Sequence, residues 1–268
     1  MFAAVKKELD AIDGPKQGVA VGDQATIDVP AGYWFVPASK MARLAELTEN
    51  LSEPGEAGAL IKGELDSVVY FTFDPIGYVK DEDSDLDAAE LLKSMQEGQL
   101  QDNIQRKQHG FDELEVVGWA KEPFYNQTTK SLEWATILRV KGSQENGSVN
   151  YNTRRLGRGG VMSVILVSNP DAMQQELAAM NANLGAFAFV AGKDYASFQQ
   201  GDHVAEIGLG ALVVGGGAAL AVKVGFFKKF WKILAAGGAA VAGGIAKLFR
   251  RKKPADATAS GDRTVDGG

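Results

Sequence analysis

Apolar and polar side chains alternate along several short segments of the chain, and this period of two predicts β-strands. Strands are expected at residues 65–73, 114–121, 132–141, 148–156 and 161–167. The last four are joined by short loops rich in turn residues, which predicts an antiparallel meander. Residues 24–29 and 33–36 predict a separate hairpin that turns at Gly32.

Helices are expected before and after this meander. Residues 40–50 carry apolar side chains at helical spacing behind Ser39, a residue suited to the N-cap. Residues 86–109 predict a long helix that ends before Gly110, and an Asn-Pro pair opens a third helix at residues 170–184. Because strands and helices do not alternate as βαβ units, the sequence predicts an α+β fold in which helices cover an antiparallel sheet.

The composition divides the chain into four parts. We expect a polar N-terminal segment at 1–18, an acidic α+β domain at 19–203, an apolar anchor rich in Gly and Ala at 204–249, and a basic, then disordered, tail at 250–268. Residues 1–18 lack the basic start, apolar core and cleavage site of a signal peptide, so either the protein is not exported or a signal has already been removed.

The apolar segment predicts attachment to membrane lipid. Residues 207–222 carry no charge and would span about 24 Å as a helix, and extension to Phe227 matches the ~30 Å hydrocarbon core. The predicted anchor residues are Ile207, Leu209, Leu212, Val213, Val214, Leu220, Val222, Phe226 and Phe227. A second stretch, 233–246, suits the membrane interface or a second span, so the anchor is expected to be a C-terminal membrane helix or a helical hairpin. The alternative is a close-packed hairpin of small residues inside a soluble protein.

Charge gives an expected orientation. Residues before Ile207 include 18 Lys and Arg against 31 Asp and Glu, whereas the residues from Ile207 on include 10 against 3. Since Lys and Arg favour the cytoplasmic side, a single span places the domain outside the cytoplasm and the C-terminus in the cytoplasm. The acidic domain should repel nucleic acid, so no nucleic-acid partner is expected.

Small residues four positions apart allow close helix packing in lipid, which predicts a homo-oligomer. The residues expected at such contacts are Ala211, Gly215, Gly238 and Ala242. Another envelope protein is the second expected partner.

Few side chains suggest chemistry. The chain has no cysteine and two histidines, and we expect no cofactor and no metal. An acidic run at 81–87 lacks the Gly and Glu that a calcium loop requires, and instead suits the start of a helix. Arg154, Arg155, Arg158, Gly159 and Gly160 could form an anion or partner contact, against the alternative of an ordinary hairpin turn with solvated arginines.

Several spaced motifs resemble the DUF2167 family of uncharacterised bacterial membrane-anchored proteins. They are Val-Gly-Trp-Ala at 117–120, Leu-Glu-Trp-Ala at 132–135, the segment 150–160, and the pattern Tyr195, Phe198, Asp202, Ala205, Gly208-Leu209. The resemblance implies an exported domain with a C-terminal anchor, and so a bacterial inner-membrane protein with the domain in the periplasm and the C-terminus in the cytoplasm. It brings no catalytic residues. The order of elements is similar to the α-β-α sandwich of PsbP and Mog1.

Together these features predict a membrane-anchored envelope protein whose domain acts as a binding or assembly module. The alternative is a ligand-sensing or hydrolytic domain tethered to the membrane, and a pore-forming protein is a third option. The sequence contains no GxxxxGK[ST], GxSxG or HExxH motif, so it favours a protein that is not an enzyme without deciding the question.

Overall fold

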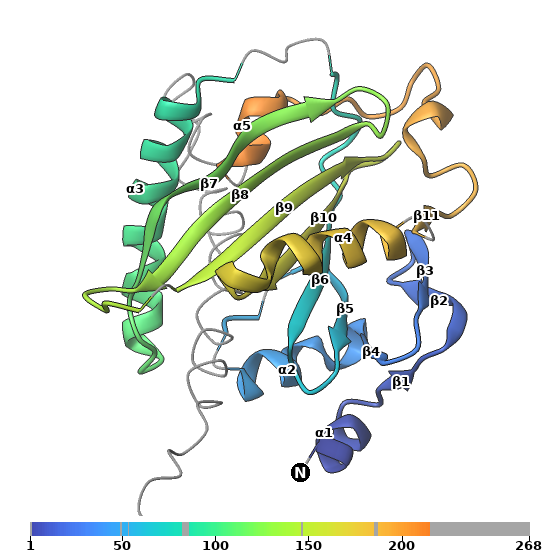
Figure 1. Ribbon diagram of the computed structural model, residues 1–268. Coiled ribbons are helices and arrows are strands. Elements are labelled where there is room, and N and C mark those ends of the chain that lie inside the picture. Colours follow the sequence, from blue (N-terminus) through green and yellow to red (C-terminus); the bar gives the residue numbers. More distant parts are fainter. Residues whose placement is uncertain are drawn as a thin grey trace, which may run out of the picture.

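The computed structural model describes residues 2–214 except 49, 53, 82–85, 146 and 185–186 (Figure 1). The strands are β1 (Ile12–Asp13), β2 (Lys16–Val21), β3 (Ala25–Val29), β4 (Tyr33–Pro37), β5 (Glu56–Lys62), β6 (Ser67–Asp74), β7 (Leu114–Asn126), β8 (Ser131–Val140), β9 (Ser148–Leu156), β10 (Val161–Ser168) and β11 (Ala188–Phe189). The helices are α1 (Phe2–Glu8), α2 (Met41–Leu47), α3 (Ala88–Gln108), α4 (Met173–Leu184) and α5 (Leu209–Val213).

The strands form two antiparallel sheets. The larger has the order β1-β4-β5-β6-β10-β9-β8-β7, and the smaller has the order β11-β3-β2. The predicted meander is confirmed as β7 to β10, each strand pairing with the next. The predicted α+β class, an antiparallel sheet with helices, is therefore confirmed.

The core has a layer on each face of the large sheet. On one face, α4 and the small sheet cover apolar side chains that include Phe35, Phe71 and Val164. On the other face, α1 and α2 cover one end of the sheet around the buried Trp34. The opposite end of that face holds a third cluster around Trp134, to which α3 and α5 contribute.

The predicted hairpin of residues 24–29 and 33–36 is wrong. β3 pairs with β2 and β11, whereas β4 pairs with β1 and β5. Gly32 has a φ of +82°, and the Tyr33 N–H donates to the Pro30 carbonyl oxygen at 3.1 Å. This turn directs the chain from one sheet to the other instead of folding it back on itself.

The predicted N-cap of the first helix differs from the structure, whereas the predicted ends of the second helix agree with it. α2 follows a 3-10 turn at Ala38–Lys40, so Lys40 and not Ser39 occupies its N-cap, without a side-chain hydrogen bond. α3 agrees with the prediction: the Asp87 carboxylate accepts hydrogen bonds from the N–H groups of Ala89 and Glu90 at 3.0 Å, and Gly110 has a φ of +72° after the last turn. A carboxylate thus satisfies the free N–H groups of the first turn.

α3 turns polar side chains toward the sheet. Asn103 both donates to the Leu114 carbonyl oxygen at 2.7 Å and accepts from the Leu114 N–H at 2.9 Å, and Gln96 donates to the Val116 carbonyl oxygen at 3.1 Å. Leu114 and Val116 lie on β7, the last strand of the large sheet. An edge strand exposes unpaired backbone groups, so these side chains take the place of a neighbouring strand.

One carboxyl on this inward side makes the stability of the fold depend on pH. Burial raises the pKa of Asp102 to about 7, although Arg106 acts to lower it. A raised carboxyl pKa contributes stability below the ordinary value of about 4 and costs stability as the pH rises toward 7. We expect Asp102→Asn to leave unfolding nearly unchanged at pH 4 and to stabilise the fold at pH 8 by up to about 4 kcal/mol. Urea unfolding at the two pH values measures this, and an equal effect at both would contradict it.

Candidate functional site

The arginines of the predicted contact do not converge. Arg154 and Arg155 are neighbours on β9, and consecutive residues of a strand point to opposite faces of the sheet. The Arg154 guanidinium lies 5.0 Å from the ring centre of Trp134, whereas that of Arg155 lies 5.0 Å from the ring centre of Phe187. Both arginines therefore pack against aromatic side chains of different core clusters.

Arg158 lies in the turn that follows β9 and binds a carboxylate. Its Nε and Nη2 atoms donate to the two oxygens of Asp202, each at 2.8 Å. The hydrogen bonds from Arg158 lower the pKa of Asp202. The Arg158 N–H also donates to the Lys193 carbonyl oxygen at 2.9 Å, so this residue connects the turn to the segment after α4.

The two glycines of the turn have different surroundings. The Gly159 carbonyl oxygen accepts from the Gly77 N–H at 3.1 Å, and a side chain at Gly159 would meet open space. A Cβ atom at Gly160 would lie 2.1 Å from the Asp74 carbonyl oxygen, which only glycine avoids. The turn therefore packs closely on the end of β6.

A hollow of about 680 Å³ opens beside this turn. Its lining consists of Gln24, Pro75, Gly77, Arg158, Gly159, Ala191, Gly192, Lys193, Asp202 and His203. The two cations already bind anionic or carbonyl oxygens: Arg158 binds Asp202, and Lys193 donates to the Asp23 carbonyl oxygen at 2.6 Å. A ligand anion would have to compete with these partners. Among the described residues, no group of three or more His, Asp and Glu side chains is placed to hold a metal ion.

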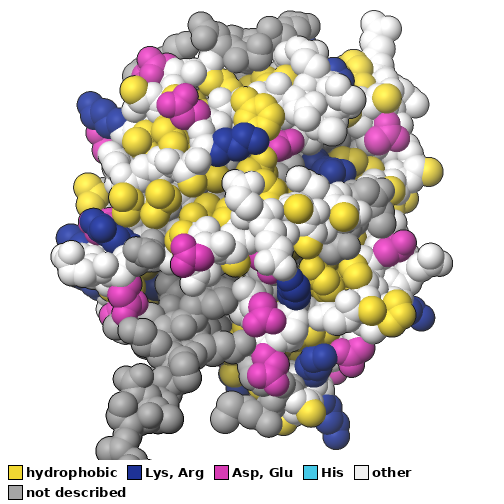
Figure 2. All heavy atoms as spheres, in the orientation of Figure 1, with side chains coloured by type: hydrophobic (Ala, Val, Ile, Leu, Met, Phe, Trp, Pro, Cys, Tyr) yellow, Lys and Arg dark blue, Asp and Glu magenta, His cyan; other side chains and the backbone are white. Residues whose placement is uncertain are grey.

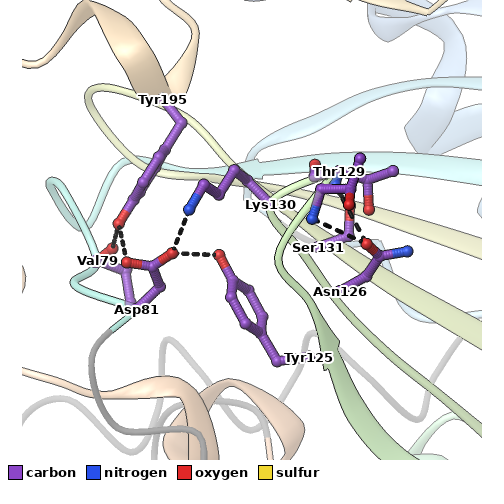
Figure 3. A network of polar contacts seen from close by, with 9 residues as sticks. Val79, Asp81, Tyr125, Asn126, Thr129, Lys130, Ser131 and Tyr195 are labelled. Carbon is purple, nitrogen blue, oxygen red and sulfur yellow. Dashed lines mark hydrogen bonds and ion pairs between the residues drawn. The ribbon is translucent and has the colours of Figure 1, made fainter.

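A second polar cluster is centred on the Asp81 carboxylate (Figure 3). One oxygen accepts from the Tyr125 hydroxyl at 2.9 Å and from the Lys130 ammonium at 2.7 Å. The other accepts from the Tyr195 hydroxyl at 3.1 Å, and that hydroxyl also lies 3.1 Å from the Val79 carbonyl oxygen. We call Asp81, Tyr125, Lys130 and Tyr195 the Asp81 cluster.

Hydrogen bonds and burial keep Asp81 ionised and the Tyr125 and Tyr195 hydroxyls protonated. Burial would raise the pKa of Asp81, but the hydrogen bonds from Lys130, Tyr125 and Tyr195 outweigh it and the pKa lies below the usual value. Burial and the contact with Asp81 raise the pKa of the Tyr125 hydroxyl. Burial, together with the contacts to Tyr78 and Asp81, raises the pKa of the Tyr195 hydroxyl. A general acid or base works best when its pKa is near the ambient pH, and the pKa values of Asp81, Tyr125 and Tyr195 are shifted away from neutral pH.

Residues 188–214, which we call the C-terminal segment, are held in place by the Asp81 cluster and by the neighbouring Tyr78. The Tyr78 ring stacks on Tyr195 at 4.4 Å and packs on Phe198 at 4.2 Å. The Tyr78 N–H donates to the His203 carbonyl oxygen at 2.8 Å, and the Ala205 N–H donates to the Tyr78 carbonyl oxygen at 2.9 Å. Residues that come after α4 thereby run along the segment that follows β6.

The start of the predicted anchor belongs to the folded domain. Leu209, Leu212 and Val213 are 1%, 6% and 2% exposed and pack in the cluster around Trp134. Ile207 and Val214 pack against the same cluster, and Ala211 is buried. No helix within the described part of the chain has the length and apolar character to cross a membrane.

The other predicted membrane and association residues, Leu220, Val222, Phe226, Phe227, Gly215, Gly238 and Ala242, lie outside the described residues. At the other end, Leu9 is fully buried and β2 begins at Lys16. The folded unit therefore extends on both sides of the predicted domain at 19–203.

Comparison with known proteins places the chain in a family. The family model described as "Protein of unknown function (DUF2167)" matches residues 14–246. The chain belongs to the DUF2167 family. The resemblance seen in the sequence motifs is thus confirmed. No curated protein matches this DUF2167 chain.

The solution structure of cyanobacterial PsbP (CyanoP) from Synechocystis sp. PCC 6803 is similar to the DUF2167 chain. The likeness has a TM-score of 0.38 and 12% identity, and it covers 67% of this chain and 91% of that chain. A likeness of this extent carries no argument about fold or function.

Sequence reasoning missed the Asp81 cluster. Asp81 was counted among the carboxylates that favour a helix start, a role that Asp87 fills. Tyr195 is an aromatic position of the family motifs, and Tyr125 lies between the motifs at 117–120 and 132–135. The sequence pattern contains no signal that these residues meet.

Proposed function

We propose that this DUF2167 protein is a membrane-attached binding or assembly module of the bacterial envelope, and that its contact with lipid starts after Val214. The observation that carries the proposal is the docking of residues 188–214 on the sheet by the Asp81 cluster and the Arg158–Asp202 pair. On this proposal the chain leaves the domain after Val214, directly before the apolar sequence.

The charged groups support a binding role over a catalytic one. The carboxylates of Asp81 and Asp202 each bind a cation and lie below their usual pKa, so both serve to connect segments of the chain. On the face shown in Figure 2, acidic and basic side chains are mixed with apolar ones. Mixed polar and apolar surfaces of this kind are ordinary for non-obligate protein interfaces.

The length of the remaining apolar sequence favours attachment at the membrane interface. With α5 docked, the uncharged run is residues 215–222, about 12 Å as a helix and less than half of the ~30 Å hydrocarbon core. Beyond it, lysines alternate with Phe226, Phe227, Phe230 and Trp231. Aromatic residues next to cations are typical of interfacial anchors. On this proposal the domain and the basic residues lie on one side of the membrane, whereas a single span would place them on opposite sides.

Lipid attachment can be tested with charges placed in the apolar sequence. We expect the full chain to float with vesicles that contain anionic lipid, and we expect Phe226→Asp/Phe227→Asp to reduce the bound fraction by about tenfold or more, because each carboxylate has to leave water. Ala257→Asp/Ala259→Asp adds the same charge beyond the basic residues and should float like the wild type. Equal flotation of both variants would contradict attachment through residues 215–249.

The binding role is tested by recovery of a partner. Proximity labelling from the full chain in native membranes should mark the same envelope protein in repeated preparations, and a chain with Asp81→Ala should mark it less if the docked segment sets the position of the domain. Recovery of no reproducible partner would remove the binding role while leaving lipid attachment in place.

A further inference from the structure

The outward side of α3 carries two large apolar side chains. Leu100 and Ile104 are 58% and 53% exposed, although the inward side of the same helix is polar. Together with three exposed charged residues they form a stripe of alternating four- and three-residue spacing, which consists of Lys93, Glu97, Leu100, Ile104 and Lys107. This spacing is that of the contact seam in a two-stranded coiled coil.

The stripe is complementary to itself when a second copy runs antiparallel. Leu100 and Ile104 lie two residues on either side of Asp102, and Glu97 and Lys107 lie five residues on either side. An antiparallel pairing centred there brings Leu100 of each copy onto Ile104 of the other, and Glu97 of each copy onto Lys107 of the other. A parallel pairing would instead place Glu97 on Glu97 and Lys107 on Lys107, which like charges disfavour.

We propose that α3 is a dimerisation surface whose partner is a second copy of this chain in antiparallel orientation. Two apolar layers lie at the centre of the seam, and an ion pair closes each end. α3 lies along the β7 edge of the large sheet (Figure 1), and neither the Asp81 cluster nor the C-terminal segment belongs to the stripe. The inference is therefore independent of the proposed attachment to lipid.

One existing contact competes with this dimer. The Lys107 ammonium lies 3.1 Å from a Glu113 carboxylate oxygen within the same chain, and the Lys107 side chain is 64% exposed. An exposed ion pair of this kind contributes little to stability, so Lys107 is available for exchange to Glu97 of the second copy. A seam of two apolar layers is small, and we expect a weak dimer that forms more readily where chains are concentrated.

Because the chain contains no cysteine, disulfide trapping can report on the seam directly. Leu100→Cys and Ile104→Cys chains, full length and in detergent micelles, are oxidised separately and as an equal mixture. The antiparallel seam predicts several times more trapped dimer in the mixture than in either chain alone. Trapping of Leu100→Cys with itself at the level of the mixture would indicate a different pairing and overturn the proposal.

Charge reversal tests the ion pairs on the same trapped pair. Glu97→Lys in both chains should lower the trapped yield by about tenfold, since both ends of the seam then carry like charges. Glu97→Lys/Lys107→Glu restores opposite charges and should restore the yield. Gln105→Lys adds a charge to an exposed position of α3 that lies further from the stripe, and it should have no effect. An unchanged yield in Glu97→Lys, or no recovery in the double variant, would contradict the seam, and so would a dimer seen by light scattering that neither cysteine traps.

Discussion

Replacing Asp81 by Ala should lower the free energy of unfolding by about 2–3 kcal/mol. The carboxylate accepts hydrogen bonds from Tyr125, Lys130 and Tyr195, and its side chain is 19% exposed. Its removal leaves the Lys130 ammonium and the Tyr125 hydroxyl in a partly buried site without this acceptor, whereas the Tyr195 hydroxyl keeps the Val79 carbonyl oxygen. A buried donor without an acceptor costs more than the lost bond itself. Urea unfolding of the full chain measures the effect.

The same variant should also change the response to acid. The pKa of Asp81 is lowered in the fold, so its contribution to stability is present above the ordinary value of about 4 and is lost as the pH falls through the lowered value. Asp81→Ala should therefore be less stable than the wild type at pH 7, and the difference between the two should become smaller as the pH falls below the ordinary value of about 4. Glu122→Ala, an exposed position on β7, serves as the control. A loss at pH 7 no greater than that of Glu122→Ala would show that the cluster does not hold the segment.

Truncating Leu212 to Ala should destabilise the domain by about 3 kcal/mol. Leu212 is 6% exposed on α5 and packs in the cluster around Trp134, so the variant loses apolar burial and leaves a cavity beside the sheet. If this leucine lay in lipid instead, the truncation would leave unfolding of the domain nearly unchanged.

Leu220→Ala makes the same truncation beyond Val214 and is the matched control. We expect it to unfold like the wild type when the transition is followed by near-ultraviolet circular dichroism in detergent. Equal losses in Leu212→Ala and Leu220→Ala would mean that the domain does not end at α5, and no loss in either would mean that α5 is not docked.

The sequence predicts those parts of the fold that depend on local patterns. The meander β7 to β10 and the helix α3 follow from alternation and from caps such as Asp87 and Gly110. The pairing of β3 with β2 and β11 does not follow from a local pattern. A strand of five residues gives no indication of its partner, and the turn at Gly32 suits a hairpin equally well.

The candidate site divides in the same way. The separation of Arg154 from Arg155 was available from the sequence, since adjacent strand residues face opposite sides of a sheet. The Asp81 cluster could not be predicted from the sequence, because Asp81, Tyr125 and Tyr195 come from three distant segments that only the tertiary fold brings together.

The anchor shows a limit of hydropathy. Leu209, Leu212 and Val213 are as apolar as membrane residues are, and the sequence alone cannot tell whether lipid or a protein core buries them. In the fold, the protein core buries these three side chains. The uncharged run that remains after α5 is therefore eight residues, 215–222, instead of the sixteen at 207–222. The expected anchor therefore depends on the docking of α5.

Labelling of single cysteines on the vesicle-bound full chain tests this account most directly. Gly208→Cys lies at the N-terminus of α5, where an added side chain meets open space, and Phe227→Cys lies in the apolar sequence. The account predicts that a water-soluble maleimide reacts with Cys at 208 equally fast with and without vesicles, and with Cys at 227 at least about tenfold more slowly when vesicles are present. Fast reaction at 227 would contradict attachment to lipid, and protection at 208 would contradict a domain that stays folded up to Val214.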